Sequence, residues 1–111
     1  MSRPPERLDL ALTKRLRAIV AGEAATESEL RDLADGAGGW QRAVAAQLRA
    51  AEARLAALNA DPASPLAEIA SELRRVETLT RELEEARSLL GRLDERTREL
   101  RTAWLAKRGR Q

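Results

Sequence analysis

The chain has 111 residues and a formal net charge of +2, and leucine and alanine supply most of its 43% hydrophobic content. It contains no cysteine and no histidine, which excludes disulfides, thiolate chemistry and the usual protein ligands of zinc. Phenylalanine and tyrosine are absent and Val and Ile are few, so the composition predicts an all-α protein.

The N-terminal part predicts a tail followed by a helix. Residues 1–5 contain two prolines and are expected to form a flexible tail. The apolar side chains of residues 6–21 recur every three or four positions, which is typical of a helix with one buried face. Gly22 is expected to end this helix. Because the helix is basic, its apolar face could pack on a partner element or, alternatively, lie on a membrane surface.

A second, short helix is expected over residues 27–34. Thr26 and Glu29 match the pattern of a capping box, in which each side chain bonds a backbone N–H at the start of the helix. The segment 36–39 then contains three glycines, each of which weakens a helix interior by about 1 kcal/mol relative to alanine. We therefore expect the chain to leave the helical conformation at residues 36–39.

Two longer helices follow, one over residues 40–59 and one over residues 65–107. Between them, Ser64 is a favourable N-cap and Pro65 a favourable first helical residue. The short connection predicts that the third helix and the first half of the last one are antiparallel neighbours.

The last helix carries a regular apolar stripe with steps of three and four residues. Over residues 79–104 the stripe covers about three and a half heptads, close to the length at which a coiled coil is indicated. The predicted architecture is one domain, residues 1–111, formed as an elongated helical hairpin or three- to four-helix bundle with a long coiled-coil-like C-terminal helix. The stripe consists of Leu66, Ile69, Leu73, Val76, Leu79, Leu83, Ala86, Leu90, Leu93, Thr97, Leu100 and Trp104.

The third helix is too short to cover the second half of the last one. Either the first two helices fold along residues 79–104, or a second chain covers them. The second alternative predicts a non-catalytic protein–protein interaction module, such as an adaptor, a chaperone-like protein or an assembly subunit, bound to itself or to another helical protein. The predicted partner-binding residues are Leu79, Leu83, Leu90, Leu93, Leu100 and Trp104.

The acidic residues of the last helix indicate a charged surface instead of a catalytic site. Each lies within four residues of an arginine, as is typical of a charged, exposed helix face on which ion pairs form at spacings of three and four residues. With histidine, cysteine and tyrosine missing, we expect no enzymatic activity, no cofactor, no metal and no small-molecule substrate. The acidic residues are Glu82, Glu84, Glu85, Asp94, Glu95 and Glu99.

Three further features bear on partners and location. Trp40 is expected to pack inside the protein, whereas Trp104 could either pack or anchor a partner. No apolar run is long enough to cross a bilayer, and the cytoplasm is the expected location. A basic C-terminal tail supports an alternative function, nucleic-acid binding through phosphate contacts. Its candidate anion-binding residues are Arg101, Lys107, Arg108 and Arg110.

Overall fold

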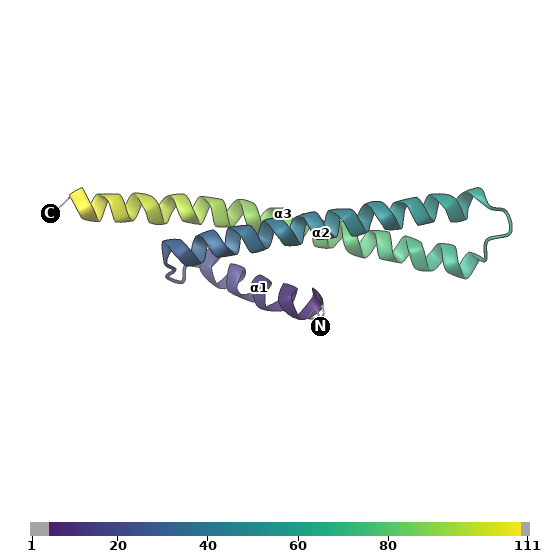
Figure 1. Cartoon of the computed structure of the whole chain (residues 1–111), viewed down its shortest axis with the longest axis horizontal. Coiled ribbons are helices and arrows are strands. Elements are labelled where there is room, and N and C mark those ends of the chain that lie inside the picture. Colours follow the sequence, from purple (N-terminus) through teal and green to yellow (C-terminus); the bar gives the residue numbers. More distant parts are fainter. Residues whose placement is uncertain (1–4, 110–111) are drawn as a thin grey trace. The chain divides into compact units, whose positions relative to one another are not determined.

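The computed structural model describes the backbone of residues 5–109 and the side chains of residues 10–109. The described residues form three helices and no strand: α1 (Pro5–Val20), α2 (Glu27–Ala60) and α3 (Leu66–Gly109) (Figure 1). This confirms the predicted all-α fold. Most of the predicted tail lies outside the described residues, and Pro5 already belongs to α1. No helix in the described part of the chain combines the length and the apolar character needed to cross a bilayer.

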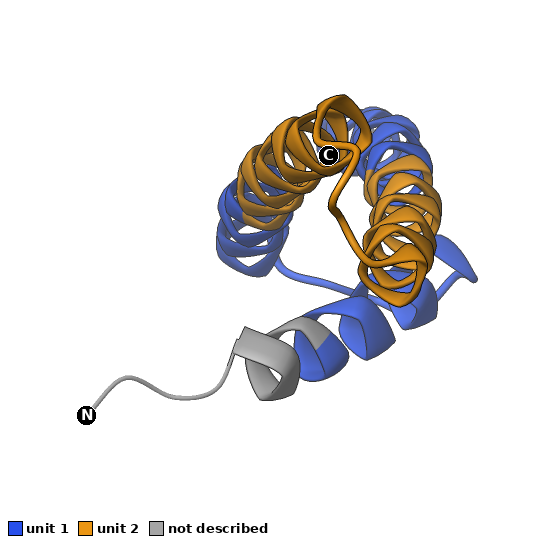
Figure 2. Ribbon diagram, turned by 90° about the vertical axis from the view of Figure 1, so that its right-hand side faces the viewer, with its two compact units in different colours: residues 1–39, 87–111 blue, residues 40–86 orange. Residues whose placement is uncertain are grey.

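The residues divide into two compact units (Figure 2). Unit 1 consists of Met1–Gly39 and Arg87–Gln111, and therefore contains α1, the beginning of α2 and the end of α3. Unit 2 consists of Trp40–Ala86, which contribute the rest of α2 and α3 and the connection between them.

Three helical segments share the core of unit 1. Of these, α1 supplies two side chains that are fully buried, Leu16 and Ile19. These two side chains lie in the same compact unit as the beginning of α2 and the end of α3. The other buried apolar residues are Leu30, Leu33 and Ala37 of α2 and Leu89 and Leu93 of α3.

The predicted break at residues 36–39 is wrong, because α2 continues through them as one helix. The reason is tertiary packing. A Cβ atom on Gly36 would lie only 3.2 Å from Cδ1 of Leu12, so the missing side chain allows α1 to approach α2 closely. Ala37, next to it, is fully buried. Burial of this surface compensates for the low helix propensity of glycine.

The end of α1 follows the prediction closely. Gly22 has a φ of 120°, a conformation that glycine adopts without strain. Its N–H donates to the carbonyl of Ile19 at 3.0 Å, and the N–H of Glu23 donates to the carbonyl of Ala18 at 3.1 Å. These two bonds are those of a Schellman motif, which satisfies carbonyl groups left over at a helix end.

Unit 2 is a helical hairpin whose two arms come from α2 and α3. Trp40 is only 6% exposed, which confirms that it packs inside the chain, and its indole N–H donates to Oε1 of Glu82 at 3.1 Å. The carboxylate thus provides the partner that a buried indole requires. The other buried apolar residues of the hairpin are Val44, Ala51, Leu79, Leu83 and Ala86.

The connection between the arms is a tight turn. The Asp61 side chain accepts a hydrogen bond from the N–H of Ala63 at 2.9 Å, as in an Asx turn. The N–H of Ile69 donates to the carbonyl of Pro65 at 3.3 Å. Since an N-cap carbonyl accepts the first α-helical hydrogen bond, Pro65 is the N-cap, one residue later than predicted.

The two glycines Gly91 and Gly36 provide a test of the packing argument. A Cβ on Gly91 would meet no atom within 4 Å, so Gly91→Ala should raise the free energy of unfolding by about 1 kcal/mol. Gly36→Ala should gain less, because the new methyl group contacts Leu12. Chemical denaturation of both variants measures this difference, and an equal or larger gain for Gly36→Ala would contradict the close contact.

Candidate functional site

The start of α2 is held by α1. The Thr26 hydroxyl oxygen accepts a hydrogen bond from the N–H of Glu29 at 3.1 Å, which is one half of the predicted capping box. The other half is not formed. Instead, the Glu29 carboxylate accepts two hydrogen bonds from Arg15, from Nε and Nη2, each at 2.7 Å. This bidentate arrangement is the strongest geometry available to an Arg–carboxylate pair.

The ion pair between Arg15 and Glu29 changes the acidity of both groups. The hydrogen bonds from Arg15 hold the pKa of the Glu29 carboxyl below its ordinary value, and those same bonds raise the pKa of Arg15. Arg15 also lies 3.3 Å from Glu23, so one α1 side chain joins both the interhelical loop and the first turn of α2.

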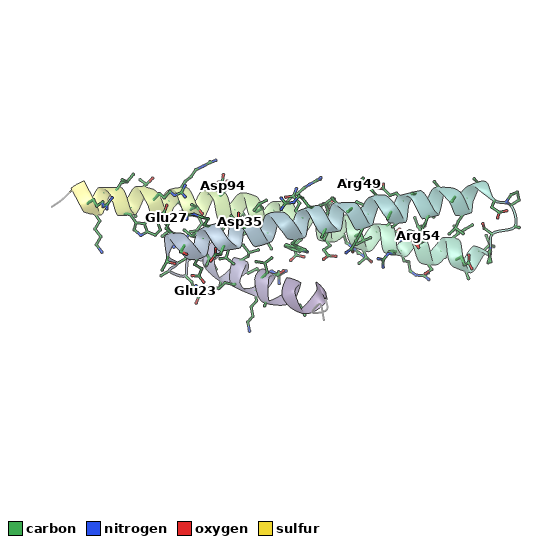
Figure 3. The ribbon with its side chains drawn as sticks, viewed as in Figure 1. Glu23, Glu27, Asp35, Arg49, Arg54 and Asp94 are labelled. Atoms are coloured by element: carbon green, nitrogen blue, oxygen red, sulfur yellow. The ribbon has the colours of Figure 1, made fainter. Side chains whose placement is uncertain are left out.

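Two arginines of α3 contact the end of α1 and the first turn of α2. Arg96 donates from Nη2 to the carbonyl of Gly22 at 3.1 Å, which adds an interhelical cap to the end of α1. Arg101 lies 3.4 Å from Oε1 of Glu27, the first residue of α2 (Figure 3). The start of α2 is therefore level with Arg101 on α3.

Among the residues of unit 1 that the structure describes, no helix runs alongside α3 beyond Arg101 (Figure 1). Residues 102–109 extend past the start of α2 by roughly 12 Å at the rise of an α-helix (Figure 1). They carry two large apolar side chains, Trp104, which is half-buried, and Leu105, which is 66% exposed.

An open hollow of about 550 Å³ lies at this end of α3. It combines the apolar side chains with three of the predicted anion-binding residues, while the fourth, Arg110, lies outside the described residues. We call this region, Leu100 with the lining residues of α3, the α3 end surface. The hollow is lined by Glu27, Arg101, Trp104, Leu105, Lys107 and Arg108.

The structure separates the predicted partner-binding residues into two groups. Leu79, Leu83 and Leu93 are 5%, 7% and 1% exposed, so each is buried inside its own unit. Heptad spacing predicts these residues as partner-binding, because spacing alone does not show which residues the chain covers itself. Leu90, Leu100 and Trp104 are partly exposed.

Leu105 is an exposed residue that the sequence interpretation missed. It lies one position after Trp104 and therefore outside the stripe that defined the candidates. The sequence did contain a signal for Leu105, because it is a second large apolar residue within the last turns of a helix and is surrounded by basic residues.

The acidic residues of α3 take part in local contacts. Arg98 lies 2.6 Å from Asp94, and Arg96 lies 3.4 Å from Glu99, at the predicted spacings of four and three residues. Glu82 accepts the bond from Trp40 described above. In the part of the chain that the structure describes, no three acidic side chains are grouped so that they could hold a metal ion.

Comparison of the chain with protein-family models, with curated proteins and with solved structures found no match.

The ion pair between Arg15 and Glu29 predicts a pH dependence of stability. Because the folded-state pKa of Glu29 is lowered, its contribution is complete above the ordinary value of 4.5 and is lost as the pH falls through the folded-state value. Thermal unfolding of the wild type and Glu29→Gln between pH 7 and pH 3 should show a wild-type advantage that shrinks below about pH 4.5. A difference that stays constant over this range would contradict the ion pair.

Proposed function

We propose that this chain is a non-catalytic helical module that binds another protein through the α3 end surface. In a cell it would act as an adaptor, a chaperone-like protein or an assembly subunit. The proposal is supported by one observation above all: α3 continues past its neighbours and carries Trp104 and Leu105 into solvent.

Exposed apolar side chains of this kind are suited to protein binding. Tryptophan is enriched among the residues that contribute most to binding energy, and a pocket beside it gives a partner side chain a place to bury. Trp104 and Leu105 lie at such a hollow. A partner helix would pack against the apolar stripe of α3 beyond Leu100, as the helices of a coiled coil pack against each other.

The apolar stripe of α3 has a buried part and an exposed part, and the proposal gives each part a different role. Leu93 is 1% exposed and belongs to the core that folds unit 1, whereas Leu105 is 66% exposed. In this proposal the buried part of the stripe stabilises the module, and the part after Arg101 meets the partner. The partner can be a second copy of the chain or a different protein.

Site-specific photo-crosslinking in cells of the source organism tests the proposal. A benzophenone amino acid in place of Leu105 should give a discrete adduct with one protein, because that residue lies in the interface. The same probe in place of Leu66, which is 82% exposed in unit 2, is the matched control and should give none.

Trp104→Ala should remove the adduct at position 105 while the helical circular dichroism stays unchanged. The mass of the adduct distinguishes a second copy from another protein. Equal adducts at positions 105 and 66, or an adduct that persists without Trp104, would contradict the proposal.

A further inference from the structure

We infer that the partner of the α3 end surface is an acidic, amphipathic segment of a different protein, with apolar side chains flanked by carboxylates. This inference depends on the proposed function and identifies the chemistry of its partner. It follows from the charges around the exposed apolar residues.

The α3 end surface combines apolar side chains with unpaired cations. Between residues 101 and 109 the sequence contains three basic residues and no acidic one. Arg101 already pairs with Glu27, the sole carboxylate that lines the hollow. Among residues 10–109, neither Lys107 nor Arg108 forms an ion pair. A partner that buries Trp104 and Leu105 therefore meets two cations that carboxylates would complement.

A second copy of the chain fits this surface poorly. In a symmetric dimer whose axis passes through this surface, Lys107 and Arg108 would lie near the same cations of the other copy. The carboxylates at the start of α2 are already engaged, because Glu23 and Glu29 pair with Arg15 and Glu27 pairs with Arg101. A different protein that brings free carboxylates is therefore the better complement to this surface.

Nucleic acid and anionic lipid also carry negative charge, but they do not match the rest of the surface. An apolar side chain of the partner is needed to cover Leu105 and to fill the hollow of about 550 Å³. A duplex would need a broad basic face, whereas the arginines that precede Arg101 are engaged in pairs, Arg96 with Glu99 and Arg98 with Asp94. A flat lipid surface would leave the hollow unfilled.

Peptide display against the full chain tests the inference. A library of random 16-residue peptides is selected for binding to the wild type and counter-selected against the double variant Trp104→Ala/Leu105→Glu. The selected peptides should carry Asp or Glu beside Leu, Ile or Phe. A synthetic copy should bind about tenfold more weakly to Lys107→Glu/Arg108→Glu, the effect of two exposed ion pairs.

Arg42→Glu/Arg49→Glu on α2 is the matched control, since it makes the same charge change at two exposed residues of unit 2, of which Figure 3 labels Arg49. It should leave peptide binding unchanged, and circular dichroism verifies the fold of every variant. Raising the salt concentration should weaken binding of the acidic peptide to the wild type, where it screens attraction, and strengthen binding to Lys107→Glu/Arg108→Glu, where it screens repulsion.

The outcomes separate the two proposals. Selected peptides that depend on Trp104 but carry no excess of acidic residues would overturn the inference and leave the proposed function standing. A crosslinked adduct composed of two copies of this chain would do the same. If no peptide depends on Trp104 and Leu105, the proposed function fails and the inference with it. Binding of duplex DNA, RNA or phosphatidylserine vesicles that is stronger than peptide binding and requires Lys107 and Arg108 would also overturn the inference.

Discussion

The contact between α1 and the beginning of α2 determines the arrangement of unit 1. Gly36 leaves room for Leu12, and the two hydrogen bonds from Arg15 to Glu29, each 2.7 Å long, hold the first turn of α2 against α1. With α2 fixed in this way, its first residue, Glu27, meets Arg101. Within unit 1, Leu89 and Leu93 of α3 lie before Arg101 and are buried, whereas Leu105 lies after it and is 66% exposed. The exposed surface is thus a consequence of where α1 holds the start of α2.

Much of the fold could be predicted because it depends on local signals. Helix-forming residues, a glycine at the end of α1 and prolines near the start of α3 act within a few residues of their own positions. The interior of α2 could not be predicted in this way. Gly36 has a low helix propensity, and only the close approach of Leu12, a residue of another helix, explains why a glycine is tolerated there. Glu29 shows the same limitation, since its capping role is replaced by a pair with Arg15.

The candidate site was predicted only in part, because spacing identifies a face of a helix but not what covers it. Leu93 and Trp104 belong to the same stripe, yet the first is fully covered by unit 1 and the second is partly exposed. A shift of one residue also matters, since neighbouring helical residues point about 100° apart. Leu89, outside the predicted stripe, is buried to 4% exposure, while Leu90, inside it, is partly exposed. Whether a residue is covered or exposed depends on packing against segments that are distant in the sequence. The spacing of residues within one helix gives no information about that packing.

Folding alone accounts for the basic residues at the end of α3 but not for the apolar ones beside them. Lys107 and Arg108 lie in the last turn, where positive charge interacts favourably with the carbonyl end of a helix. An exposed leucine in the same turn gains no burial, and Leu105 is 66% exposed. A lysine or glutamate there would serve the helix equally well and would increase its solubility. In the proposed function this apolar side chain becomes buried against a partner, and in the further inference the neighbouring cations favour partners that carry carboxylates.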